Sequence, residues 1–359
     1  MSWIRVFNIN ILLISLVILI IELIYGGWLY PEQKNNCNYV LCSAKVTWES
    51  GITSGRTTSY TKDKFGLRNR NKINSDIDLL VIGGSTSDQR YVNDNKTWDH
   101  LLQGMFKRDG NNIDIVNAGI DGQSTVGHIW NFKEWFPYIP NFSPKYILFY
   151  VGINDIFPLE NTAAYDNVVV GSWKQAIKQN SVLYRIYREF NYRSNNYLTK
   201  KTKAGHGENS THLNYIDKFN YEKNSWELYK ELLIKNKLIV NLDSLVKLTR
   251  ELGSEPIFVT QKTARWILKD NVIFGSGVYS ADYYFKGSLF KMSNSDIGYA
   301  EKIVSDSIME FCNSNNLHCI NGFNKFEFNK HNTYDLVHTN IHGSEEISKK
   351  LYPELKKLF

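Results

Sequence analysis

The chain has 359 residues, of which 43% are hydrophobic, and a formal net charge of +6. This length allows one large domain or two small ones. Its Lys and Arg residues are scattered, and only Lys200, Lys201 and Lys203 form a cluster. No nucleic-acid-binding module accompanies the charge, so the sequence indicates a solvated basic surface and no nucleic-acid partner.

An apolar segment near the N-terminus predicts a membrane crossing. Residues 9–30 read INILLISLVILIIELIYGGWLY, which is long enough for a bilayer, since a span takes roughly 20 residues. Trp28 and Tyr30 suit the membrane–water interface, and Arg5 before the segment favours a cytoplasmic N-terminus. A cleaved signal peptide is the alternative, but no small-x-small site follows. We therefore predict an uncleaved single-pass anchor over 1–30 in the cytoplasmic membrane, with the remaining chain on the periplasmic or cell-surface side.

Glu22 lies within this apolar segment. Ionisable groups in lipid are costly, so such a residue can mark a functional site. Because Glu22 is near the outer end of the segment, snorkelling to the interface or protonation is the simpler interpretation.

Residues 31–76 are polar and rich in turn-forming residues, which predicts a stalk that leads into the fold. The four cysteines are Cys37, Cys42, Cys312 and Cys319. Three pairings are possible, and proximity alone favours Cys37–Cys42 and Cys312–Cys319 in an exported domain, with buried free thiols as the alternative. Neither spacing matches a zinc site, and no histidine pattern accompanies them, so no metal is expected.

From residue 77 onward, apolar runs alternate with segments of helical periodicity. The runs predict five strands, at 77–83, 113–120, 145–155, 255–261 and 317–321. Helical spacing is seen at 95–108, 125–139, 172–190, 221–252, 298–315 and 342–359. This alternation predicts an α/β fold with a parallel sheet over 77–359. The stretch of about 156–254 separates the third and fourth strands and is predicted to be an insertion or helical cap.

In such a sheet, working residues collect at the carboxyl ends of the strands. The first strand ends at GGSTS (83–87), the second at NAGIDGQS (117–124) and the third at VGIND (151–155). The chain then carries DLVHTNIHG (335–343) after the last strand. Each segment alone has an ordinary explanation as a turn. Their combination and order favour a catalytic site.

These four segments resemble the blocks of the SGNH (GDSL-like) hydrolase superfamily. The resemblance implies a three-layer α/β/α, flavodoxin-like fold, to which this chain adds the helical insertion and the N-terminal transmembrane helix predicted above. It implies Ser85 as the nucleophile, with Asp335 and His338 as acid and base; Gly84 replaces the Asp of the common GDS form. The backbone N–H groups of Ser85 and Gly122 and the amide of Asn154 would form the oxyanion hole. No cofactor is implied.

A serine hydroxyl needs a base within hydrogen-bond reach, and an acid that orients this base completes the set. We therefore predict a serine esterase that removes O-acetyl or other acyl groups from an extracytoplasmic glycan, with an ester substrate as its partner. An O-acyltransferase with the same triad is the first alternative, and a glycan-binding or assembly scaffold with an idle site is the second. The anchor, GGS and the segment FGLRN (65–69) resemble members associated with bacterial surface polysaccharides, which implies polysaccharide-assembly partners.

Two further sets of residues are candidates for substrate contact. Gln261 and Arg265 follow the fourth strand at the active edge, where a surface loop is an equally good interpretation. Four aromatic residues of the predicted insertion could stack on sugar rings, although their helical spacing favours a place in the core of a cap. These are Trp173, Tyr184, Tyr187 and Tyr192.

Overall fold

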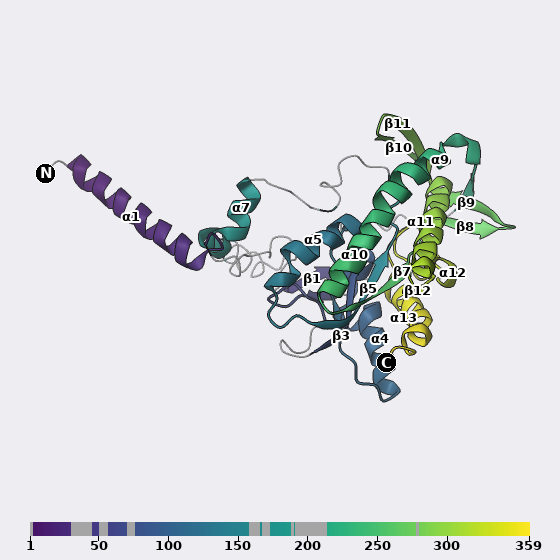
Figure 1. The fold of residues 1–359 in the computed structure, drawn as a ribbon, viewed down its shortest axis with the longest axis horizontal. Coiled ribbons are helices and arrows are strands. Elements are labelled where there is room, and N and C mark those ends of the chain that lie inside the picture. Colours follow the sequence, from purple (N-terminus) through teal and green to yellow (C-terminus); the bar gives the residue numbers. More distant parts are fainter. Residues whose placement is uncertain are drawn as a thin grey trace.

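The computed structural model describes residues 3–29, 45–49, 57–69, 76–157, 166, 173–187, 190, 214–277 and 280–359. Within these residues the longer helices are α1 (Trp3–Tyr25), α4 (Trp98–Arg108), α5 (Thr125–Glu134), α7 (Trp173–Asn180), α10 (Val240–Glu251), α11 (Asn294–Ser314) and α13 (Ile341–Leu355). The short ones include α3 (Ser85–Asp88), α9 (Trp226–Tyr229) and α12 (Gly322–Lys325), and the π-helical segment η6 (Lys230–Ile239) joins α9 to α10. Figure 1 shows how these elements are arranged.

The body is built on a sheet of five parallel strands. Its order is β12 (His318–Ile320), β7 (Glu255–Thr260), β5 (Pro144–Val151), β3 (Ile77–Gly83) and β4 (Ile115–Asn117). Numbered along the chain, this is the order 2-1-3-4-5 of flavodoxin-like sheets. The strands are apolar on both faces because helices cover both, and β3 buries every residue except the half-buried Asp78. The five predicted strands all occur.

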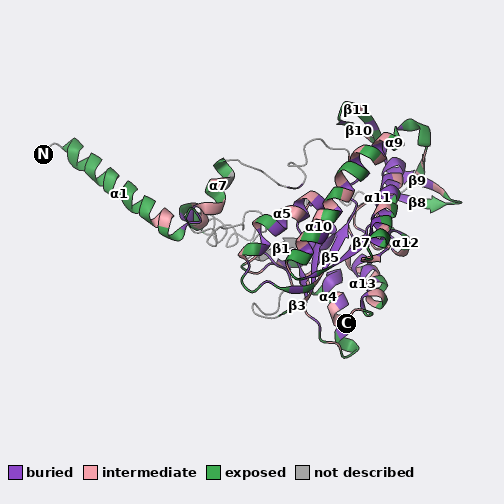
Figure 2. Cartoon of the chain, in the orientation of Figure 1, coloured by how far each residue is buried: buried purple, intermediate pink, exposed green. Residues whose placement is uncertain are grey.

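Helices form a layer on each side of this sheet. One core cluster joins the sheet to α5, α10 and α11, and a second joins it to α4 and α13. Figure 2 shows the sheet and the inner faces of these helices as buried. The predicted α/β/α architecture is therefore confirmed.

Part of the predicted insertion belongs to the core of the fold. The consecutive helical segments α9, η6 and α10 contribute Trp226, Tyr229, Leu238 and Leu242 to the main core cluster, and all four are buried. They form the crossover that returns the chain from β5 to β7. An amphipathic pattern shows that a helix buries one face, but it does not say whether a sheet or a cap receives that face.

The end of the predicted stalk also packs on the body. Strand β2 (Thr57–Thr61) pairs with β1 (Lys45–Glu49) and buries Tyr60, and the segment that follows buries Lys62 and Arg68. This packing was not predicted, because Lys and Arg are rarely buried without a partner and no partner for them is evident from the sequence.

Two small β elements lie between β7 and α11. β8 (Trp266–Lys269) and β9 (Val272–Ser276) form a three-stranded sheet with β6 (Tyr215–Lys218), and β10 (Ser280–Phe285) pairs with β11 (Ser288–Ser293). They were not predicted, because short strands with one exposed face carry a weak periodic signal.

The structure joins Cys312 and Cys319 in a disulfide, with Cα atoms 6.2 Å apart. It links the end of α11 to β12. The predicted Cys37–Cys42 pair lies outside the described residues.

Within the described part of the chain, α1 is the one helix long and apolar enough to cross a membrane. It extends away from the body and is exposed along most of its length (Figure 2). By length and composition, either an anchor or a signal sequence fits this helix.

Candidate active site

The candidate site lies where the strand order reverses. β3 and β5 are neighbours at the centre of the sheet, whereas β4 lies on the other side of β3. The connection after β3 therefore leads toward one edge of the sheet and the connection after β5 toward the other. Open α/β sheets bind ligands at such a switch point, at the carboxyl ends of the strands. Ser85 follows β3 directly, and Asn154 lies three residues beyond the end of β5.

Ser85, His338 and Asp335 form a continuous hydrogen-bonded series. The Oγ of Ser85 lies 2.8 Å from Nε2 of His338, and Nδ1 of the same ring lies 2.7 Å from Oδ2 of Asp335. Ser85 and His338 are 253 residues apart in the sequence, so the fold brings them together. A serine paired with a base that is oriented by a carboxylate is the arrangement of an activated nucleophile.

The carboxylate of Asp335 is fixed by its own loop. Its Oδ1 accepts hydrogen bonds from the backbone N–H groups of Val337 at 2.7 Å and of His338 at 2.6 Å. Burial acts to raise the pKa of Asp335, but the hydrogen bonds and charge of His338 outweigh it and leave this pKa below its usual value. The group is therefore ionised at neutral pH and stabilises the imidazolium that forms in the reaction. The ring of Tyr334 stacks parallel to that of His338, with centroids 5.5 Å apart.

The segments that carry Ser85, Gly122 and Asn154 meet at Gly84. A Cβ on Gly84 would lie 2.6 Å from Nδ2 of Asn154 and 2.9 Å from the carbonyl oxygen of Gln123, closer than real Cβ atoms approach. The same amide of Asn154 donates to the Gln123 oxygen at 2.8 Å. Glycine at position 84 thus allows the loops that carry Gly122 and Asn154 to contact the start of α3, the nucleophile helix that begins with Ser85. This is a steric reason for GGS in place of GDS.

Gly122 lies in a loop that its neighbours hold firmly. Its φ of 78° is in the left-handed region, which favours glycine. The next residue, Gln123, is buried, and its side chain bonds both Asn131 and His128 of α5. Burial lowers the pKa of His128 to about 3, so this ring is neutral and structural. The loop is rigid enough to present backbone donors at a fixed place.

Two glutamines that connect the catalytic segments were not predicted in that role. Gln89, at the end of α3, donates to Thr339 at 3.0 Å and Ser344 at 2.8 Å, and so ties the nucleophile helix to the segment that follows His338. Gln261 donates to Thr86 at 2.7 Å and accepts from the N–H of Ile153 at 3.1 Å.

Gln261 was a candidate for substrate contact, with a surface loop as the equal alternative. Its side chain is buried, and both ends of its amide are used within the protein. It is a positioning residue. Arg265 is half-buried and its guanidinium lies 3.3 Å from Oδ1 of Asn294. Polar residues at a strand end look alike in sequence, so the pattern could not show that Gln261 would be buried and Arg265 half-buried.

A buried cluster of charged residues from the segment before β3 contacts the nucleophile helix α3. Asp88 of α3 accepts from the hydroxyl of Tyr60 at 2.8 Å and pairs with Lys62 at 3.1 Å. Arg68, in the FGLRN segment, donates to the backbone oxygens of Asp88, Gln89 and Val92. Burial acts to raise the pKa of Asp88, but Lys62 and the arginines outweigh it and lower this pKa. The residues before β3 therefore help to hold α3, and with it Ser85, in position.

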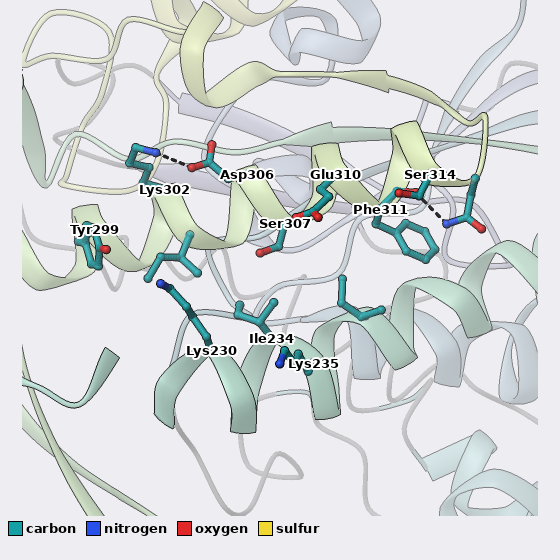
Figure 3. A pocket seen from close by; sticks show the side chains of 13 residues that line it. Lys230, Ile234, Lys235, Tyr299, Lys302, Asp306, Ser307, Glu310, Phe311 and Ser314 are labelled. Atoms are coloured by element: carbon teal, nitrogen blue, oxygen red, sulfur yellow. Dashed lines mark hydrogen bonds and ion pairs between the residues drawn. The ribbon is translucent and has the colours of Figure 1, made fainter. Parts of the chain in front are cut away.

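No group of three or more His, Cys, Asp or Glu residues suited to a metal ion occurs in the described ranges. A groove of about 620 Å³ lies elsewhere, between η6 and α11, and its lining includes Ile234, Tyr299 and Phe311 (Figure 3). None of the triad residues lines it.

Comparisons with known proteins show which family this chain is similar to. The family model described as GDSL-like lipase/acylhydrolase matches residues 79–351. No curated protein matches the chain. Similar solved structures include that of TesA, with 13% identity, 78% of this chain and 99% of that chain covered, and a TM-score of 0.42. The esterase EstA from Pseudoalteromonas sp. has 14% identity, 78% and 97% coverage and a TM-score of 0.38. Axe2, an acetylxylan esterase from Geobacillus stearothermophilus, has 13% identity, 79% and 96% coverage and a TM-score of 0.42.

Proposed function

The chain belongs to the GDSL-like lipase/acylhydrolase family and is a carboxylic ester hydrolase, and from this premise we propose that it is a membrane-anchored serine esterase that removes O-acetyl or other acyl groups from an extracytoplasmic glycan. The observation that carries the mechanism is the hydrogen-bonded series from Asp335 through His338 to Ser85.

In the proposed reaction, Nε2 of His338 accepts the Ser85 proton as Oγ attacks the ester carbonyl. The resulting imidazolium is held by the ionised Asp335. As the bond from the carbonyl carbon to the sugar oxygen breaks, His338 gives its proton to that oxygen, so that the sugar leaves as an alcohol and the acyl group stays on Ser85. Water, deprotonated by His338, attacks this acyl-serine. The bond between the acyl group and Oγ breaks, His338 returns the proton to Oγ of Ser85, and the carboxylic acid is released. The negative charge on the carbonyl oxygen in both steps is stabilised by the Ser85 and Gly122 N–H groups and the Asn154 amide, each donor contributing about 2.7–4 kcal/mol.

Location and substrate rest on separate support. The apolar helix α1 supports a membrane anchor. The export of the body follows from Arg5 before this helix, because positive charge is retained on the cytoplasmic side. The glycan is proposed from the resemblance of the GGS and FGLRN segments, together with the anchor, to members associated with surface polysaccharides.

Full-length protein in detergent should be supplied with an activated acetyl ester and rising concentrations of deacetylated glycan, while free acetate and acetylated glycan are measured. We expect acetate to dominate throughout. In the cell, acyl-coenzyme A stays in the cytoplasm, so an extracytoplasmic site without a delivering partner is expected to use water as the acceptor, and added glycan should not compete with water. A steep shift to acetylated glycan would identify an acyltransferase. Absence of any acyl release, with Ser85→Ala as the matched blank, would favour the scaffold.

A further inference from the structure

The helices that follow the described residue Asp166 expose a set of large apolar side chains. Within 173–190, six such residues are more than a third exposed, and the set is defined here as the 173–190 surface. These residues are Trp173, Ile177, Leu183, Ile186, Tyr187 and Phe190. The sequence favoured a buried cap core for the aromatic residues here, whereas Trp173 is 69% and Tyr187 61% exposed.

The spacing of these residues places them on helical faces. Leu183, Ile186 and Tyr187 stand at i, i+3 and i+4 of the 182–187 helix, which is one stripe, and Trp173 and Ile177 stand at i and i+4 of α7. Contiguous exposed apolar side chains of this size usually mark an interaction surface.

Hydrogen bonds fasten this surface to the end of α1. The Glu22 carboxylate accepts from the Ser181 hydroxyl at 2.7 Å and from the backbone N–H groups of Val182 at 3.1 Å and Leu183 at 3.0 Å. It therefore caps the first turn of the 182–187 helix, where free N–H groups and the helix dipole favour a carboxylate. This capping contact explains Glu22 better than snorkelling to water.

Two further contacts make the junction rigid. The guanidinium of Arg185 donates to the backbone oxygen of Tyr25 at 2.7 Å, and the N–H of Gly27 donates to the oxygen of Asn180 at 2.9 Å. A Cβ on Gly26 would lie 2.6 Å from that same Asn180 oxygen, so the two segments are in close contact. Figure 1 shows α7 beside the C-terminal end of α1.

We propose that the 173–190 surface is a membrane-interface element that lies in the headgroup region of the same bilayer that α1 crosses. The proposal rests on the membrane anchor proposed above. Because the surface is held at the last turn of α1, it lies at the depth where that helix leaves the hydrocarbon. Trp173 and Tyr187 are residue types that favour this depth.

Basic side chains complete the pattern of an interfacial helix. Lys174 and Lys178 are exposed on α7, and Arg185 is on the next helix. Basic and apolar faces together are typical of helices that lie in the plane of an anionic membrane surface. The bilayer is thus favoured over a protein partner.

The element also connects to the active site. Asp166 accepts from the N–H and the hydroxyl of Ser124, at 2.6 and 2.9 Å, at the start of α5 and next to the Gly122 loop. Seven residues of chain from Asp166 to Trp173 span at most about 25 Å. The Ser124 end of the site therefore lies within about 25 Å of Trp173 on the 173–190 surface, and this closeness to the proposed interface favours acyl groups on membrane-proximal or lipid-linked glycan.

The test uses full-length protein in nanodiscs of phosphatidylethanolamine and phosphatidylglycerol. A nitroxide is placed at Ile186→Cys, and its collisions with oxygen and with a water-soluble nickel chelate are compared. Tyr284→Cys, on β10 of the body, is the matched aqueous control because Tyr284 is also an exposed apolar residue, 68% exposed. Leu16→Cys, inside α1, reports the bilayer, Phe190→Cys repeats the measurement, and the parent chain gives the background from native thiols.

We expect the oxygen-to-nickel ratio at Ile186 and Phe190 to be several-fold above that at Tyr284 and below that at Leu16. Ratios at both positions equal to that at Tyr284, with Leu16 in lipid, would overturn the interface and leave the anchor intact. A low ratio at Leu16 would show that the anchor itself is wrong. If Ile186 is water-exposed in nanodiscs but shielded from both reagents in native membranes, a protein partner covers the surface and the lipid proposal fails.

Discussion

Gly84 lies where the three loops of the candidate site converge. Its φ of −82° is open to any residue, so the need for glycine here comes from space and not from conformation. The GGS spelling, which departs from the usual GDS, is therefore matched to the close approach of Asn154 and Gln123 in this chain.

Gly84→Ala should lower kcat for ester hydrolysis by about 10²-fold, because the new Cβ displaces the Asn154 amide, and misplacement of a catalytic group by about 1 Å has this effect. Steady-state kinetics on an activated acetyl ester would measure the change. Gly104→Ala is the matched control and should retain activity, because the nearest atom beyond the local helix backbone, a side-chain nitrogen of Arg108, would lie 3.8 Å from the new Cβ. Unchanged kcat in Gly84→Ala would mean that Asn154 does not act as an oxyanion donor.

Asp155, next to Asn154, is buried, and its Oδ1 accepts from the Thr125 hydroxyl at 2.6 Å and the Thr125 N–H at 3.1 Å. Burial raises its pKa from 3.8 to about 6, and the hydrogen bonds from Thr125 act in the opposite direction. A pKa raised by folding gives a contribution to stability that is complete below the unfolded pKa and is lost as pH rises through the folded pKa. The cost of ionised Asp155 is therefore present above about pH 6.

Asp155→Asn keeps an acceptor for Thr125 and removes this charge. It should stabilise the protein relative to wild type by on the order of 2–3 kcal/mol at pH 8, with the gain disappearing toward pH 4. Thermal unfolding across this pH range measures the difference, and Asp282→Asn on an exposed strand is the control. A gain that does not depend on pH would show that the titration of Asp155 is not its source.

The segment 57–69, which precedes the first parallel strand, contacts the nucleophile helix although its polar composition suggests a solvated stalk. Lys62 pairs with Asp88 of the nucleophile helix and also donates to the Gly119 oxygen at 2.8 Å, so one side chain links three segments. A polar stretch in sequence predicts exposure, because the partner of a buried charge is usually far away along the chain. The roles of Gln89 and Gln261 were not predicted for the same reason, because their hydrogen-bond partners Thr339, Ser344 and Thr86 are far away along the chain.

Lys62→Met should lower the free energy of unfolding by about 3 kcal/mol, since it leaves the Asp88 carboxylate buried beside fewer positive charges. Denaturant unfolding of the full-length protein in detergent would measure this loss. Lys96→Met, at an exposed position, is expected to change stability by less than about 0.5 kcal/mol. A loss of similar size in both variants would show that the buried pair is not stabilising.

Across the whole molecule, the sequence predicted the central sheet well because strands buried on both faces read as continuous apolar runs, as in residues 77–83 and 145–151. Motif order also predicted which side chains the loops would bring together, and Ser85, His338 and Asp335 are now seen in contact. The helical stretch over 226–251 was predicted, but its place in the core was not, because what an amphipathic element packs against is decided by tertiary contacts. The hairpins over 266–293 were not predicted.

The most direct test of the central claim is the labelling of the full-length protein with a fluorophosphonate, followed by peptide mass analysis. A fluorophosphonate reacts with a serine hydroxyl only when a base activates it, so it reports the Ser85–His338 contact itself. We expect one labelled peptide carrying the adduct on Ser85, with labelling lost in Ser85→Ala and strongly reduced in His338→Ala. Resistance of the wild-type protein to the label, or an adduct that persists in Ser85→Ala, would contradict a serine esterase centred on Ser85.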